Sequence, residues 1–207
     1  MRYIDSAFLI FAKAPIEGFV KTRLIPALGE SGATQLYRRL LHHLVYGLVR
    51  EQLAAIELWC TPDSAHPDFA RLQQLSGVSL HKQQSGDLGE RMYHAVQESL
   101  GRHQHVILLG VDCPALTMSH FAQALSWLHE GTDAVLGPVE DGGYALLGIS
   151  QAADCLFTGI PWSTDKVTEL TRQGLKQMNW KWRELPLMWD LDRPEDLRRL
   201  RELRIDL

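Results

Sequence analysis

Cations and a hydroxyl gather near the start of the chain, in the stretch FAKAPIEGFVKTRL (residues 11–24). Gly18 lets the backbone turn there, and Lys21, Thr22 and Arg23 follow. Phosphate groups are bound by this kind of arrangement, in which backbone N–H groups act together with Arg or Lys. The stretch is not a P-loop, because GxxxxGK[ST] is absent, and GxGxxG is absent as well. A phosphate site and a solvated loop both fit these residues, and the position after an apolar segment favours phosphate.

Aspartates stand at two further places where chemistry could occur. Asp112 ends the apolar run in LLGVDCP, where a carboxylate could bind Mg²⁺ beside a pyrophosphate or could simply form a turn. Asp190 and Asp192 in WDLDRPEDL would share one face of an extended chain and could complete such a metal site. Asp192 could instead cap the helix that Pro194 begins. Spacing alone ranks neither of these two aspartates above the other.

Two glycine-containing turns carry further candidates. In EDGGY, Asp141 could act as a general base or bind a hydroxyl group, although a tight hairpin also explains the paired glycines. In SGDLGER, Asp87 could contact a base or a ribose, or could cap the helix that follows. Trp162 in PWSTDK could line a sugar or base pocket.

The composition is typical of a globular protein and excludes several classes. The 207 residues are 45% hydrophobic and 22% charged, with a formal net charge of −4. A duplex nucleic-acid binder would usually carry a basic surplus, so the early cations indicate a small anionic ligand. Three cysteines without a CxxC pair argue against a disulfide framework or structural zinc and favour a reducing cytoplasm. Neither a signal-peptide pattern nor the run of about 20 apolar residues that a membrane span needs is present.

Strand and helix signals alternate along the chain. This pattern predicts parallel strands joined by right-handed crossovers, and the EDGGY turn adds an antiparallel pair, so the sheet should be mixed. Ligands bind at the carboxyl ends of such strands, which is where the candidate residues should gather. The expected strands cover residues 6–12, 54–60, 78–83 and 106–111, two more flank EDGGY, and residues 180–192 are extended. The expected helices cover residues 33–53, 66–75, 88–101, 117–131, 163–178 (capped by Ser163 or Thr164) and 193–203.

Six blocks in order resemble a known bacterial family: FAKAPIEGFVKTRL, GDLGERM, LLGVDCPAL, GPVEDGGYALLGI, IPWSTDKV and DLDRPEDL. They are similar to blocks of the radical-SAM-associated transferases, which are glycosyltransferase-A-like members of the nucleotide-diphospho-sugar transferase superfamily. The resemblance covers nearly the whole chain. It implies one domain, residues 1–207, with a Rossmann-like three-layer α/β/α sandwich around a mostly parallel mixed sheet.

The resemblance also implies roles for individual residues. Two motifs differ from those of the relatives: KAPIEGFVKTR stands in place of a Gly-x-Gly-x-Arg loop, and VDCP stands in place of Asp-x-Asp. The implied nucleotide-binding residues are Lys13, Gly18, Lys21, Thr22, Arg23, Asp87 and Gly89. The implied metal ligands, for Mg²⁺ or Mn²⁺, are Asp112 and Asp192. The acceptor would lie against Gly142, Gly143 and Tyr144, together with Trp162.

The candidate residues and the resemblance together predict a metal-dependent transferase with an activated nucleotide donor, foremost a nucleotide-sugar glycosyltransferase. Lys21 and Arg23 would stabilise charge that grows in the transition state, and Asp141 would orient or deprotonate the acceptor hydroxyl. One alternative is a nucleotidyltransferase that attacks an α-phosphate and releases pyrophosphate. Another is a nucleotide-binding protein without turnover. The expected partners are a nucleotide donor and a small acceptor, with neither nucleic acid nor membrane.

Overall fold

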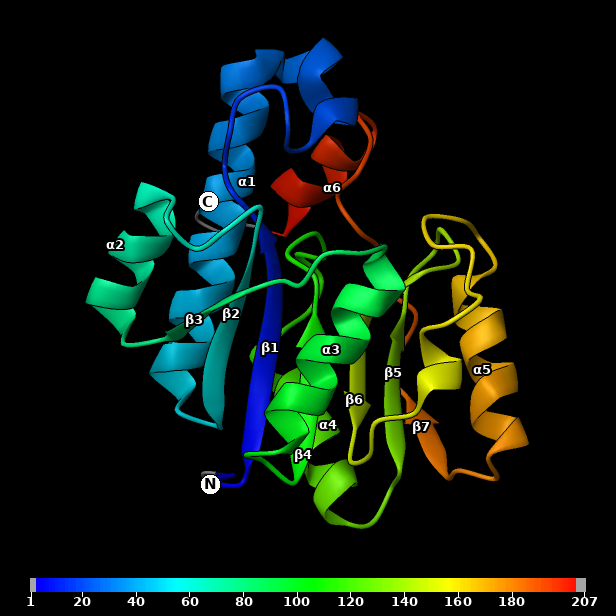
Figure 1. Ribbon diagram of the computed structural model, residues 1–207. Helices are drawn as coiled ribbons and strands as arrows, with labels where there is room; N and C mark the ends of the chain where they lie inside the picture. Colours follow the sequence, from blue (N-terminus) through cyan, green and yellow to red (C-terminus); the bar gives the residue numbers. More distant parts are fainter. Residues whose placement is uncertain (1–2, 204–207) are drawn as a thin grey trace.

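One twisted sheet carries most of the core in the computed structural model, which describes residues 3–203 (Figure 1). Its seven strands follow the order β3-β2-β1-β4-β6-β5-β7. β6 runs antiparallel to both β4 and β5, while the other pairs are parallel. The mixed, mostly parallel sheet of the predicted fold class is therefore confirmed. The strands are β1 (Ser6–Lys13), β2 (Ala55–Thr61), β3 (Ser79–Lys82), β4 (His105–Leu109), β5 (Ala134–Pro138), β6 (Tyr144–Ile149) and β7 (Trp182–Glu184).

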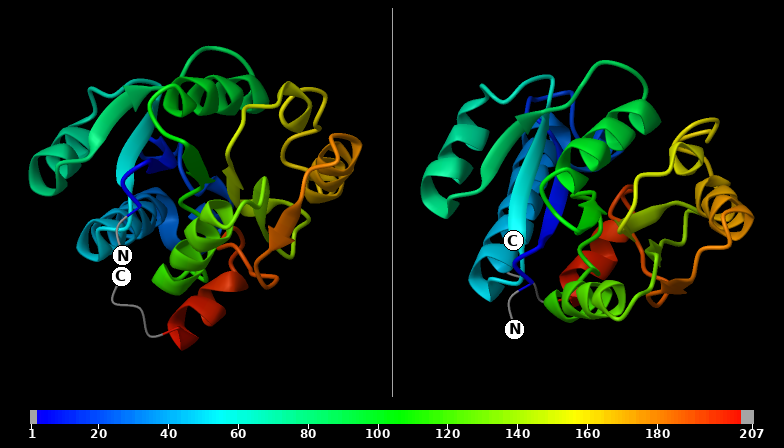
Figure 2. Two further views of the ribbon diagram at one scale, coloured as in Figure 1. Left: turned by 90° about the horizontal axis from the view of Figure 1, so that it is seen from below. Right: turned by 60° about the horizontal axis from the view of Figure 1, so that its bottom comes forward.

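Helices cover both faces of the sheet (Figure 2). On one face α1, α2 and α4 bury their apolar sides against strand residues such as Phe8 and Ile107. On the other face α3 and α5 pack over Leu9 and Leu108. Successive residues of β1 thus enter opposite cores, and for this reason the strand reads as an unbroken apolar run. The helices are α1 (Ile25–Glu51), α2 (Pro67–Ser76), α3 (Leu88–Leu100), α4 (Met118–His129), α5 (Val167–Gln177) and α6 (Asp196–Glu202), with short 3₁₀ turns η1 (Thr22–Leu24) and η2 (Asp154–Leu156).

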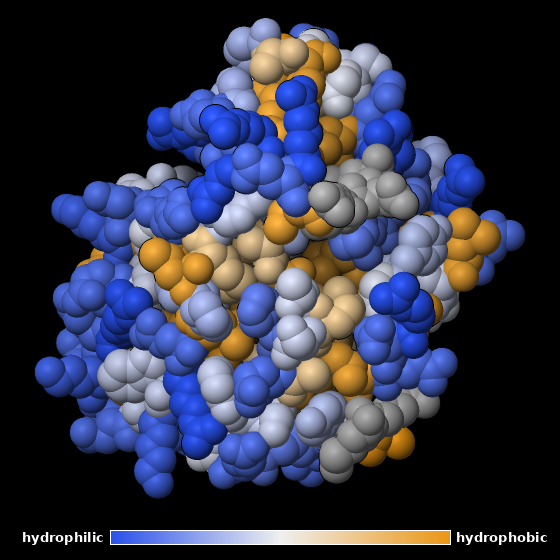
Figure 3. All heavy atoms as spheres, turned by 180° about the vertical axis from the view of Figure 1, so that it is seen from behind, coloured by the Kyte–Doolittle hydropathy of each residue, from blue (hydrophilic) through white to orange (hydrophobic). Residues whose placement is uncertain are grey.

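The outer sides of the helices are largely polar. Seen from behind, the surface is mostly hydrophilic, with apolar side chains showing between the polar ones (Figure 3). This is the surface expected of amphipathic helices that bury only one stripe. Within residues 3–203, every helix is too short or too polar to cross a lipid bilayer.

Three element boundaries differ from the expectations. α1 begins at Ile25 rather than at residue 33, and it bends at Gly29, whose φ is 70°. β4 ends at Leu109, so the chain has left the sheet before Asp112. α5 begins at Val167 after Lys166, so the predicted cap was wrong: Ser163 has a left-handed φ of 65°, and the Thr164 hydroxyl donates to Pro161 O.

Candidate functional site

A cleft of about 530 Å³ opens at the carboxyl ends of β1, β2 and β4. β1 has β2 on one side and β4 on the other, so the chain order reverses at this point of the sheet. Open α/β sheets bind ligands at such a reversal, beyond the carboxyl ends of the strands. The loop after β1 lies beside α6 at this end of the sheet (Figure 1). The cleft brings together these predicted residues: Lys13, Lys21, Thr22, Arg23, Asp112, Asp141, Gly143, Tyr144, Trp162, Asp190 and Asp192.

Lys21 is the most constrained cation of the cleft. Its backbone is left-handed, with φ 48° and ψ 41°, which is uncommon for a residue with a side chain. The side chain is only 4% exposed, and its Nζ lies 2.6 Å from Asp112 Oδ1. The same ammonium donates to the carbonyl oxygen of Leu191. Lys21 therefore links the two segments that carry the predicted metal ligands.

Arg23 makes a second contact of the same kind. Its Nη1 donates to Asp192 Oδ2, and both side chains are open to solvent. The hydrogen bond and the charge of Asp192 raise the pKa of Arg23. The prediction that Asp192 caps the last helix is wrong, because Glu195 precedes α6 and the Asp196 carboxylate accepts from the N–H groups of Asp192 and Arg193.

Negative charge also collects on the cleft. Asp112, Asp141, Asp190 and Asp192 all line it, although they come from three distant parts of the chain. The pKa of Asp190 is raised to about 6, first by burial and then by the charges of Asp141 and Asp192. The Leu191 N–H donates to Asp112 O at 2.7 Å, which joins the two segments of predicted metal ligands through their backbones.

This donor set suits a hard cation that is shared with a phosphate. Among the described residues, His, Cys, Asp and Glu form no group of three or more able to hold a metal ion. Mg²⁺, however, is commonly held by one or two carboxylates together with substrate phosphates and water. The carboxylates of Asp112, Asp190 and Asp192, beside the cations Lys21 and Arg23, fit that mode, so the residues fit Mg²⁺ or Mn²⁺ bound with a nucleotide.

α6 supports the carboxylates from outside the cleft. Arg199 donates to both oxygens of Glu140, at 2.6 and 2.9 Å, and its guanidinium lies 4.6 Å from the centre of the Trp189 ring. Glu140 precedes Asp141 and Trp189 precedes Asp190, so one arginine contacts both acidic segments. Arg199 was not predicted from the sequence, because the short α6 around it gives no sign of a partner 59 residues away.

The β3 side of the cleft combines apolar walls with a polar edge. Phe11, Leu88 and Met92 line it together with Gln83 and Arg91. Arg91 Nη1 donates to Gln83 Oε1 at 3.0 Å. Gln83 is buried, but it lies just beyond β3 in a polar stretch, so its local sequence does not mark it as a site residue.

The β6 side carries unpaired donors. The hydroxyl of Tyr144 and the indole N–H of Trp162 are buried and find no hydrogen-bond partner within the described part of the chain. The two rings meet edge to face, 6.3 Å apart. Asp141 lies nearby, with its Oδ1 accepting from the N–H of Gly143 at 2.8 Å.

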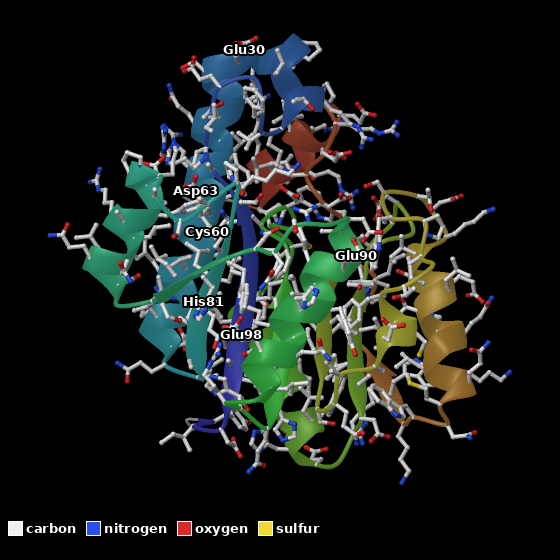
Figure 4. The ribbon with its side chains drawn as sticks, viewed as in Figure 1. Glu30, Cys60, Asp63, His81, Glu90 and Glu98 are labelled. Carbon is white, nitrogen blue, oxygen red and sulfur yellow. The ribbon has the colours of Figure 1, made fainter. Side chains whose placement is uncertain are left out.

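Four predicted site residues do not line the cleft: Gly18, Asp87, Gly89 and Gly142. Asp87 forms a capping box with Glu90 at the start of α3, which matches the helix-cap alternative. Figure 4 shows Glu90 at this end of the helix. Gly89 packs so closely that an added Cβ would lie 2.2 Å from Phe157 O. Gly142 has φ 89°, and its Cβ would lie 2.2 Å from Asp165 O. Gly18 also has a positive φ, of 79°. Backbone packing and turn geometry thus account for the three glycines.

Residues 44–164 match the model of a bacterial protein family described as "uncharacterized protein conserved in bacteria (DUF2064)". The chain belongs to the DUF2064 family. No curated protein matches this DUF2064 chain.

Solved structures share the fold of this DUF2064 protein. A protein of Desulfovibrio desulfuricans G20, provisionally described as a nucleotide-diphospho-sugar transferase, is 31% identical, with a TM-score of 0.89 over 98% of this chain and 89% of that one. A CMP:2-keto-3-deoxy-manno-octonic acid synthetase in complex with CTP is 10% identical, with a TM-score of 0.60 over 96% and 98%. Glucosyl-3-phosphoglycerate synthase of Mycobacterium tuberculosis, in complex with Mn²⁺ and UDP, is 10% identical, with a TM-score of 0.56 over 95% and 75%. The last two likenesses show the fold alone.

Proposed function

We propose that this DUF2064 protein is a transferase that uses an activated nucleotide, with glycosyl transfer from a nucleotide sugar as its reaction. The observation that carries the proposal is the meeting of Lys21 and Arg23 with the carboxylates of Asp112, Asp190 and Asp192 in one cleft. A pyrophosphate is bound by cationic donors and by a shared metal ion. Lys21 and Arg23 can supply the donors, and the carboxylates can hold the metal ion. The provisional description of the Desulfovibrio protein supports the same class.

The charges of the cleft set the direction of the donor. Asp141 lies at the turn before β6 and would repel the phosphates, while the β3 side is walled by Phe11 and Met92. The nucleoside therefore lies toward β3, where a base can rest on apolar side chains. The Arg91 guanidinium has N–H donors and no acceptor, so it would donate hydrogen bonds to acceptor atoms of the base.

The acceptor then lies toward β6. Asp141 is held through the N–H of Gly143, which leaves its other oxygen for the acceptor hydroxyl. There it orients the hydroxyl or takes its proton. Tyr144 and Trp162 line the same side, where their rings would pack against the acceptor.

Asp112 and the segment of Asp190 and Asp192 would hold the divalent cation. When bound, Mg²⁺ or Mn²⁺ supplies charge neutralisation for the pyrophosphate and the departing nucleoside diphosphate. Asp190 joins Asp192 as a candidate for the second carboxylate, because it lines the same cleft two residues away. The radical-SAM association, the cytoplasmic location and the single domain stay predictions.

The proposal is tested by incubating the protein with single nucleotide sugars or nucleoside triphosphates, with Mn²⁺ and a panel of small acceptors. Release of a nucleoside diphosphate from a nucleotide sugar supports it. Release of pyrophosphate from a triphosphate would show the nucleotidyltransferase instead, and metal-independent binding without turnover would show the non-catalytic alternative.

Variants connect the result to the cleft. Asp112→Asn should remove metal-dependent nucleotide binding while the protein still unfolds cooperatively, because the amide oxygen can accept from the Lys21 ammonium. Glu17→Gln removes an exposed carboxylate of the loop after β1, outside the cleft lining, and serves as the control. Full metal-dependent affinity in Asp112→Asn would contradict the metal assignment.

A further inference from the structure

Lys21 occupies the position where a cation is expected. Its ammonium contacts Asp112 Oδ1 at 2.6 Å and the carbonyl oxygen of Leu191, which separates Asp190 from Asp192. A lysine ammonium has three donors and no acceptor, and here two of the donors are used by the proposed metal-ligand segments. The cation paired with the Asp112 carboxylate is therefore the Lys21 ammonium.

The arrangement costs free energy that a solvated lysine would not pay. The Lys21 side chain is 4% exposed, so the ammonium has lost most of its water. Its left-handed backbone adds strain of about 1 kcal/mol or more. Strain of this kind persists where the surrounding structure holds the residue in place, and it gathers at functional sites. Lys13, at the end of β1, has a regular strand backbone and an exposed side chain.

We propose that the Lys21 ammonium and a divalent cation compete for Asp112, and that the pyrophosphate of the donor ends the competition by drawing Lys21 away. This inference rests on the proposed function, which places the metal on Asp112. A monovalent ammonium at 2.6 Å and a metal ion cannot both contact the same carboxylate region without strong repulsion. The phosphate is the one partner that gives Lys21 a better acceptor and also contributes ligands to the metal.

Arg23 and Asp192 repeat the pairing on the exposed side of the cleft. Both loop cations are thus bound by carboxylates in the absence of ligand, and both are released only when another anion replaces those carboxylates. The metal ion consequently binds the protein–nucleotide complex more tightly than it binds the free protein. In the same way, the nucleotide binds the protein–metal complex more tightly than it binds the free protein. Linkage requires that the gain be the same in both directions.

The test measures Mn²⁺ alone, by calorimetry and by the electron paramagnetic resonance signal of free Mn²⁺, with nucleotide-free protein. Lys21→Met should bind Mn²⁺ at least tenfold more tightly than the parent, because the competitor is gone. Lys13→Met removes a positive charge of the same cleft that does not contact Asp112, and it should change the affinity less than twofold. Lys21→Arg keeps the competitor and should bind Mn²⁺ as weakly as the parent.

Each outcome decides a different claim. Unchanged or weaker Mn²⁺ binding by Lys21→Met would overturn the competition. Adding Asp112→Asn to Lys21→Met should abolish the gained site. If the double variant still binds Mn²⁺ tightly, the metal site of the proposed function is wrong. Should Lys21→Met fail to unfold cooperatively, Lys21→Gln provides the same neutral change with a side chain that can still donate to Leu191 O.

Discussion

Gly89 gives the sharpest test of how the cleft is built. It is the second residue of α3, and the resemblance to known transferases implies that it contacts the nucleotide. The structure instead places it against the backbone oxygen of Phe157 and the indole of Trp162. An alanine Cβ would lie 2.2 Å from Phe157 O and 2.5 Å from Trp162 Nε1. Gly89→Ala should therefore destabilise the protein before any ligand is added.

The size of the effect follows from that overlap. Ordinary contact begins at 3.4 Å, so the segment of Phe157 must move by 3.4 − 2.2 = 1.2 Å. Overpacking that shifts backbone costs about 3 kcal/mol at the upper end of the usual range. The higher helix propensity of alanine returns about 1 kcal/mol. The net loss of about 2 kcal/mol corresponds to a melting temperature about 4–8 °C lower for a chain of this size.

Urea and thermal unfolding measure the loss, and titration with a panel of nucleoside diphosphates separates the two roles. Gly32→Ala, inside α1, is the control: its Cβ would meet only Leu28 Cβ, at 3.2 Å, so stability should change by less than about 1 kcal/mol. A Gly89→Ala protein with unchanged stability would refute the packing argument. If such a protein also lost nucleotide affinity, the nucleotide-contact role would be favoured in its place.

Three other predictions concern the core, the pH dependence and the base. Phe121→Ala should cost about 3–5 kcal/mol in urea unfolding, because the ring is fully buried and meets Phe8 at 5.5 Å; a loss under 1 kcal/mol would contradict this packing. Burial and the neighbouring His129 lower the pKa of His105 from 6.5, so the unfolded chain takes up this proton first and stability falls as pH drops below 6.5. His105→Gln should lessen the drop in urea midpoint between pH 7.5 and 5.5, and an unchanged drop would count against it. Arg91→Gln should reduce discrimination among nucleobases about tenfold or more in a binding panel, and an unaltered preference would remove Arg91 from the base site.

Periodicity in the sequence was enough to predict the alternation of strands and helices. β1 and β4 are unbroken apolar runs because both of their faces are covered. The capping-box residues Asp87 and Glu90 mark the start of α3 in the sequence. These features depend on residues a few positions apart. The start of α1 was missed because Gly29 and Gly32 interrupt the apolar pattern, and because the first turn of the helix is separated from the rest by the non-helical backbone of Gly29.

The sequence also determined which residue types reach the carboxyl edge of the sheet, since every parallel strand ends there. Tertiary structure alone decided which of them meet. Asp112 and Lys21 are 91 residues apart, and Arg23 and Asp192 are 169 apart. Gln83 and Arg199 matter only through partners that local sequence cannot indicate. The physical reason is that charge pairing and close backbone packing depend on distances across the fold, whereas propensity and periodicity act only between neighbours along the chain.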